Sequence, residues 1–124
     1  MTLNEFQAKA MTTCMPSSRN ISYMLLNLVG EVGEFSSKIG KHIRKGNMRI
    51  VGNSLFCELE NKEWLKADEE LMKEAGDILW QLSGLCFVMG WDLEEVALGN
   101  LAKLAARKEA GTIDGNGDGI IREK

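Results

Sequence analysis

Residues 24–39 read MLLNLVGEVGEFSSKI and carry two periodic patterns side by side. Apolar side chains recur every three or four residues, the repeat of an α-helix with one buried face; they are Met24, Leu28, Val32, Phe35 and Ile39. Polar side chains recur beside them at spacings of four, three and four residues; they are Asn27, Glu31, Glu34 and Lys38. The stretch therefore predicts a helix that buries one stripe and presents a polar strip along its edge.

A second acidic strip lies further along the chain. Its members repeat the spacings of the first strip; they are Glu70, Glu74, Asp77 and Gln81. If the two helices face each other, four carboxylates meet in a partly buried cleft, namely those of Glu31, Glu34, Glu74 and Asp77. Their mutual repulsion would raise their pKa values unless cations neutralise them. On spacing alone, two solvated acidic helix faces remain an alternative.

The residue types in the strips indicate which cation would suit them. Every clustered ligand is an oxygen, His42 is the single histidine, and no cysteine lies in either strip. Mg²⁺ or Mn²⁺ is therefore favoured over zinc or a histidine-containing di-iron site.

Glycines interrupt both strips. Gly30 and Gly33 flank the Glu31 turn, and Gly76 precedes Asp77. Each glycine inside a helix costs roughly 1 kcal/mol relative to alanine. We expect the close approach of a neighbouring helix or a ligand at Gly30 and Gly33 to compensate.

Strand-like alternation is almost absent from the rest of the chain, so the expected fold class is all-α. Four helices are expected, at about Leu3–Thr13, from after Asn20 to about Lys45, at about Asp68–Met89, and from after Asp92 to about Ala110. Gly46, Gly90 and Gly111 would stop the last three. Asp92 with Glu95 three residues later resembles a capping box. From about 46 to 66 the pattern breaks down, which predicts an irregular insertion, with a short hairpin as one form of it.

Length and composition set outer limits. The 124 residues suffice for one domain, 1–124, which ends in a glycine-rich tail at 111–124. A net charge of −3 argues against a nucleic-acid-binding surface. The odd, scattered cysteines Cys14, Cys57 and Cys86 fit thiols in a reducing cytosol. With neither a signal sequence nor a membrane-spanning apolar run, we expect a cytoplasmic protein without a membrane partner.

The segment Ile78–Met89 is apolar nearly all round, whereas a helix on one side of a small monomer keeps a polar outer face. The spare face needs a partner, most simply a second copy of the chain. We expect a homodimer or dimer of dimers whose interface buries Leu79, Leu82, Cys86 or their immediate neighbours.

Three segments together resemble the MazG-like, all-α nucleoside triphosphate pyrophosphatases. They are LVGEVGE at 28–34, KEAGDILW at 73–80 and NLAKLAAR at 100–107. With the first helix and the Lys41-His42 pair, the similarity covers most of the chain. The resemblance implies a four-helix MazG-like bundle that hydrolyses (deoxy)nucleoside triphosphates to the monophosphate and pyrophosphate, as in nucleotide-pool house-cleaning.

The resemblance also implies residue roles. The acids Glu31, Glu34, Glu74 and Asp77 would hold Mg²⁺, for which Mn²⁺ could substitute, and would serve catalysis because the metal activates the attacking water. Asn100, Lys103 and Arg107 would bind phosphate or sugar from one face of the last helix, with a solvated basic face as the alternative. Further candidates for substrate binding are Gln7, Asn27, Lys41 and Trp80, of which Trp80 equally suits the core.

Some features stay open. Gly30 stands where many relatives have a further glutamate, so the number of metal ions is not decided, and neither is the nucleotide. Asp114–Ile121 mimics the first half of a calcium loop but lacks the later glutamate and the exit helix; a tail that closes over bound nucleotide is the alternative. The strongest rival interpretation of the whole chain is a non-catalytic helical nucleotide- or metal-binding scaffold protein.

Overall fold

A computed structural model describes residues 1–112 of the chain. The elements follow in the order α1 (Leu3–Met11), a 3-10 turn (Pro16–Ser18), α2 (Ile21–Arg44), β1 (Met48–Val51), β2 (Ser54–Cys57), α3 (Asn61–Val88) and α4 (Leu93–Ala110). The part of the chain that the structure describes thus has the four expected helices, and no helix in it is long and apolar enough to cross a membrane. The calcium-like segment and the rest of the tail lie outside the described residues.

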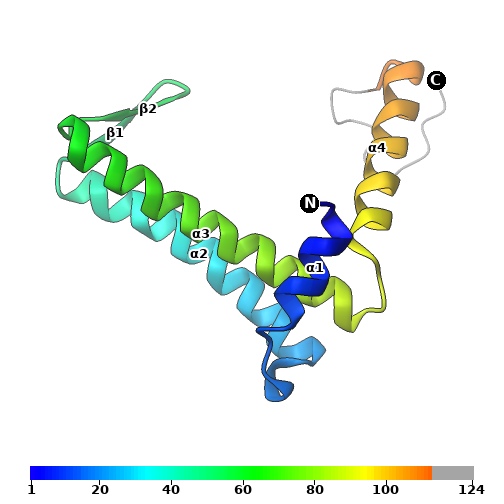
Figure 1. The fold of residues 1–124 in the computed structure, drawn as a ribbon. Coiled ribbons are helices and arrows are strands. Elements are labelled where there is room, and N and C mark those ends of the chain that lie inside the picture. The colour runs from blue at the N-terminus through cyan, green and yellow to red at the C-terminus, as the bar shows by residue number, and fades with distance from the viewer. Residues whose placement is uncertain (113–124) are drawn as a thin grey trace.

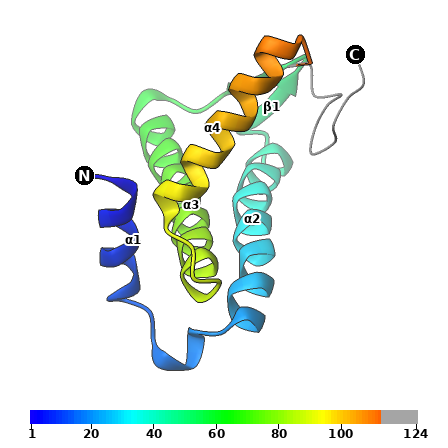
Figure 2. The same cartoon turned by 90° about the vertical axis from the view of Figure 1, so that its right-hand side faces the viewer.

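Helices α2 and α3 form a long antiparallel pair, and α1 lies beside α3 (Figures 1 and 2). The α2 helix begins where the side chain of Asn20 accepts a hydrogen bond of 2.8 Å from the Tyr23 N–H. The α3 helix begins at Asn61, earlier than the expected Asp68. The reason is tertiary, because Trp64 and Ala67 in its first turns pack against Met48 of β1.

Three glycines end the helices as the sequence predicts. Gly46, Gly90 and Gly111 have φ values of +78°, +77° and +74°, a left-handed conformation that costs glycine little. The residue after each of them donates its N–H to a carbonyl of the last turn. For α3, Trp91 donates to the Cys86 carbonyl at 2.8 Å and Gly90 donates to the Phe87 carbonyl at 3.0 Å. This pattern satisfies carbonyls that the end of a helix leaves without partners.

The insertion between α2 and α3 is a β-hairpin followed by the first turns of α3. Its strands pair antiparallel from Met48 opposite Cys57 to Val51 opposite Ser54, with Gly52 at φ +60° in the turn. Arg49 forms an ion pair with Glu58 and lies over the Phe56 ring at 5.1 Å from its centroid. The short hairpin expected as one form of the insertion is therefore observed. Its two-stranded sheet is a departure from the all-α prediction in an otherwise helical structure.

Two apolar clusters hold the α2–α3 pair together, one toward each end. The α1 cluster joins α1 and the start of α2 to the last turns of α3; it contains Ala10, Met11, Cys14 and Met24, with Phe6, Trp80, Leu85 and Val88 packed against it. The hairpin cluster joins the hairpin to the other end of the pair; it contains Met48, Ala67 and Leu71, with Phe35, Ile39, Cys57, Leu59 and Trp64 packed against it. The middle of the pair lies between the clusters, and both clusters constrain its register.

The start of α4 is capped by α1. Asp92 is the N-cap residue but its side chain makes no cap hydrogen bond, so the expected capping box with Glu95 is wrong. Instead, the Leu93 N–H donates to Gln7 Oε1 at 3.1 Å, and the Glu94 N–H donates to Asn4 Oδ1 at 3.0 Å. A capping box does form at α1, between Thr2 and Glu5. Beyond its first turns α4 leads away from the α2–α3 pair (Figure 1).

Glycine packing differs from the prediction. A Cβ added at Gly33 or Gly76 would meet nothing within 4 Å, and one at Gly30 would meet only Asn27 of the same helix. Among residues 1–112, no neighbouring helix therefore approaches these positions, and the approach of a ligand there stays a prediction. The close approach occurs at Gly84, where a Cβ would lie 2.5 Å from the Met24 sulfur.

The apolar face of α3 is covered more fully than expected. Cys86 is 2% exposed and is therefore already buried within one chain, whereas its neighbour Phe87 is exposed. The predicted interface around Leu79, Leu82 and Cys86 stays a prediction. Leu82 is half-buried, and Leu79 remains exposed. The larger uncovered apolar surface lies on α2, where Leu26 and Val29 are 72% and 70% exposed.

Candidate metal site

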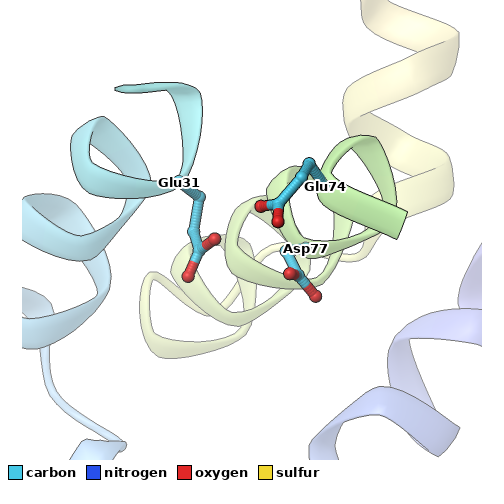
Figure 3. A group of neighbouring side chains, drawn as sticks. All are labelled: Glu31, Glu74 and Asp77. Atoms are coloured by element: carbon cyan, nitrogen blue, oxygen red, sulfur yellow. The ribbon is translucent and has the colours of Figure 1, made fainter. Parts of the chain in front are cut away.

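Three carboxylates meet across the middle of the α2–α3 pair. Glu31 of α2 faces Glu74 and Asp77 of α3, and one oxygen from each lies within 4.8 Å of the others (Figure 3). Glu74 and Asp77 share a face of α3 because they are three residues apart. Glu31 and Glu74 are half-buried, whereas Asp77 is exposed. The predicted meeting of the two acidic strips is therefore observed for these three residues.

Electrostatics in this acidic group act most strongly on Glu31. Partial burial raises the pKa of this carboxyl, because the charged form loses hydration. The nearby charges of Asp77 and Glu74, and then Glu34, raise the same pKa further. A hydrogen bond from Asn27 lowers it but does not reverse the direction. A cation between the helices would remove the part of this pKa shift that comes from the neighbouring carboxylates.

Two hydrogen-bonded amides lie next to Glu31, of which Asn27 is half-buried and Gln81 is buried. The Asn27 Nδ2 donates to Gln81 Oε1 at 2.7 Å and lies 3.4 Å from Glu31 Oε1. Gln81 is 1% exposed, and its own Nε2 donates toward the sulfur of Met24 at 3.2 Å. Gln81 thus directs the Asn27 amide nitrogen toward the acidic group. Sequence reasoning placed Gln81 at the end of the second strip but gave it no role.

A cation also touches the group. The Lys38 Nζ lies 3.4 Å from Glu74 Oε1, so Lys38 joins α2 to α3 through a proposed metal ligand. In the sequence Lys38 was visible only as the last member of the first strip. Its partner depends on the register of the two helices, which the strip alone does not specify.

Glu34, the fourth predicted ligand, is exposed and lies outside the group of three. It is close enough for its charge to raise the pKa of Glu31. Its role as a metal ligand stays a prediction.

Residues 19–112 match the MazG nucleotide pyrophosphohydrolase domain, a range that includes all three clustered acids. The chain belongs to the MazG nucleotide pyrophosphohydrolase family. It is also similar to the Gene 37 protein of Mycobacterium phage L5, with 34% identity over 102 residues that cover 82% of this chain and 78% of that protein. No solved structure matches the chain significantly. The family resemblance predicted from the three motifs is confirmed.

The donor set of this MazG domain fits a hard divalent cation. All three clustered ligands are carboxylates, and neither histidine nor cysteine joins them. Mg²⁺ and Mn²⁺ prefer such oxygen ligands, whereas zinc sites usually include nitrogen or sulfur. After burial, the charges of Asp77 and Glu74 are the next causes of the raised pKa of Glu31, and a bound cation would relieve that repulsion.

The residues of α4 that were predicted to bind substrate do not belong to the group formed by Glu31, Glu74 and Asp77. Asn100 and Lys103 are exposed and Arg107 is half-buried; all three belong to α4, which leads away from the α2–α3 pair (Figure 1). Lys41 is exposed near the end of α2. Their roles in substrate binding stay predictions.

Two of the further candidates for substrate binding, Gln7 and Trp80, make structural contacts. The Gln7 amide is buried; its Nε2 donates to the carbonyls of Ser83 at 3.2 Å and Trp91 at 3.0 Å, while its oxygen caps α4. The Trp80 indole N–H donates to Thr13 Oγ1 at 2.9 Å and to the Ala10 carbonyl at 3.1 Å. These contacts tie α1 to α3 and α4, which favours a structural role for both residues. Asn27 remains the candidate nearest to the acids.

Proposed function

We propose that this chain hydrolyses nucleoside triphosphates to the monophosphate and pyrophosphate in a Mg²⁺-dependent reaction, with Mn²⁺ as a possible replacement. Membership of the MazG nucleotide pyrophosphohydrolase family supports the reaction type. The observation that carries the proposal is the group of Glu31, Glu74 and Asp77, whose carboxylate oxygens come within 4.8 Å of one another.

In this proposal the acids hold the metal, and Glu34 completes the set when nucleotide is present. Mg²⁺ bound there would neutralise phosphate charge and lower the pKa of the attacking water. Glu31 accepts the Asn27 hydrogen bond on one side, so its carboxylate is held facing α3. The buried Gln81 fixes Asn27 in turn. Such support matters because catalysis requires ligands that do not reorganise during the reaction.

The same proposal includes a homodimer or dimer of dimers. Several apolar side chains on one turn after another of α2 are exposed; they are Leu25, Leu26, Val29 and Val32. On α4, Leu98 and Leu101 are 64% and 61% exposed. Exposed apolar side chains on this scale indicate an association surface, and a symmetric copy would cover it. Asn100, Lys103 and Arg107 on α4 would then bind phosphate in an assembled site.

A panel of canonical and modified nucleoside triphosphates, with and without Mg²⁺, tests the function. We expect Mg²⁺-dependent release of pyrophosphate and monophosphate, with no release of orthophosphate. Binding of metal or nucleotide without turnover of any triphosphate would support the scaffold interpretation instead. The relative turnover across the panel would identify the preferred nucleotide.

A further inference from the structure

Lys38 occupies an unusual position for a surface lysine. Its Nζ lies 3.4 Å from Glu74 Oε1, and the two side chains are only 33% and 16% exposed. Lys38 follows Glu31 by two helical turns and therefore lies on the same side of α2. Its helix neighbours Phe35 and Ile39 pack against the hairpin cluster, so the backbone at Lys38 is held in place. The ammonium is thus built into the edge of the acidic group.

A second lysine offers a useful contrast. Lys73 directly precedes Glu74 in the sequence, but it pairs with Glu69 of the same helix at 3.8 Å. Those side chains are 75% and 69% exposed, so solvent screens the pair. Lys38 contacts a carboxylate of the acidic group, whereas Lys73 contacts one outside it.

The position of Lys38 conflicts with a metal at the same carboxylates. Its ammonium contacts Glu74, which is one of the three clustered acids. A divalent ion bound to Glu74 would compete with the ammonium for that carboxylate and repel it. The flexible four-carbon stem of a lysine allows its ammonium to turn to another anion, whose oxygens it can bind as a point charge. The anion that arrives with the metal is the phosphate chain of the nucleotide.

We propose that Lys38 is a phosphate-binding residue of this site, which pairs with Glu74 in the metal-free protein and turns to the nucleotide phosphates when metal binds. The inference rests on the proposed function, since it needs a metal at Glu31, Glu74 and Asp77. It predicts two opposite effects of removing the Lys38 charge. Metal alone should bind more tightly because its competitor is gone, whereas phosphate in the presence of metal should bind more weakly.

The test uses the full chain and the variant Lys38→Met, which keeps most of the stem and removes the charge. Calorimetric titration with Mn²⁺ alone should give a dissociation constant several-fold lower than that of the wild type. Titration of the variant with inorganic pyrophosphate at saturating Mg²⁺ should give a dissociation constant about tenfold higher than that of the wild type. Lys38→Arg keeps the charge and should restore Mn²⁺ binding to the wild-type value. It should recover only part of the pyrophosphate binding, because its stiffer fork fits a different geometry.

Lys73→Met is the matched control and should change neither titration. Far-ultraviolet circular dichroism checks that each variant keeps its helices, and Lys38→Gln provides a second neutral variant. Unchanged or weaker Mn²⁺ binding in both neutral variants would overturn the inference. Tighter Mn²⁺ binding with unchanged pyrophosphate binding would overturn the phosphate role. A wild-type chain that binds no Mn²⁺ would overturn the proposed metal site itself, which is a different result from either of these.

Discussion

At the scale of single residues, the three clustered acids are not equivalent. Glu31 has the raised pKa and a neighbouring amide, Glu74 has the ammonium of Lys38, and Asp77 is the most exposed. Removing one negative charge therefore has a different consequence at each position. Without metal, a carboxylate that neighbouring carboxylates repel destabilises the fold, whereas a carboxylate paired with an ammonium does not.

Amide substitutions separate the catalytic role of the acids from their effect on stability. We expect Glu31→Gln, Glu74→Gln and Asp77→Asn each to lower turnover by orders of magnitude, because the metal position depends on them. In metal-free protein at pH 7, Glu31→Gln should raise the melting temperature. Glu74→Gln should not raise it, since that change leaves Lys38 without its partner. Steady-state kinetics and calorimetric melts provide the measurements, and full activity in all three variants would refute the catalytic role.

The stability of the metal-free protein should also depend on pH through Glu31. The pKa of Glu31 is raised in the folded state above its ordinary value of 4.5. Its favourable contribution to stability is therefore complete below that ordinary value and is lost as pH rises through the folded pKa. The melting temperatures of the wild type and Glu31→Gln should converge near pH 4 and diverge toward pH 7. A constant difference across this range would contradict the expectation. Saturating Mg²⁺ should stabilise the wild type at neutral pH.

At the scale of elements, the α2–α3 pair is the part that makes the site. Its register is constrained by the α1 cluster at one end and by the hairpin cluster at the other, with the acids between them. The hairpin, which the sequence offered as one form of the insertion, helps to hold the pair together, because its Met48 is 2% exposed between α2 and α3. Disturbing either cluster would shift the facing acids relative to each other.

Replacing helix glycines by alanine tests which of them pack closely against another side chain. Gly84→Ala should destabilise the protein by about 1–3 kcal/mol, because the new methyl group would overlap fully buried Met24. Gly33→Ala is the matched control in open space and should gain up to about 1 kcal/mol from helix propensity. Urea unfolding of both variants checks the pair. Equal effects at the two positions would mean that Met24 does not pack against Gly84.

At the scale of the whole molecule, much of the apolar surface is left uncovered by the residues that the structure describes. A second copy of the chain that covered the exposed side chains of α2 and α4 would remove the unfavourable free energy of their contact with water. The predicted α3 interface around Leu79, Leu82, Cys86 or their neighbours stays a prediction, and the exposed side chains of α2 offer a second, larger surface for association.

Charge on the α2 face should break the association. Leu26 is 72% exposed in one chain, so Leu26→Glu should leave the fold intact while it opposes burial in an interface. We expect light scattering of the wild type to give at least twice the 13.8 kDa mass of one chain, and that of Leu26→Glu to give a single chain mass. Ile50→Glu adds the same charge on the hairpin and should not change the mass. A monomeric wild type at micromolar concentration would remove the oligomer proposal.

Sequence alone determined the features that depend on neighbours along the chain. Helical periodicity predicted four helices, and Gly46, Gly90 and Gly111 marked their ends because only local backbone geometry is involved. The spacing of the acids and the three motifs were enough to predict the MazG family. Tail residues from 113 onward, with the calcium-like segment among them, lie beyond what the structure describes.

Tertiary structure decided which of these residues meet. Three of the four acids come together, Lys38 pairs with Glu74, and α1 caps α4 through Gln7. Gly84, not Gly33, is the glycine at a close contact. Each of these outcomes depends on the register between helices, which is set by apolar contacts among residues far apart in the sequence. Periodicity describes one helix at a time, so it predicts the acidic strips but not the register at which they face each other.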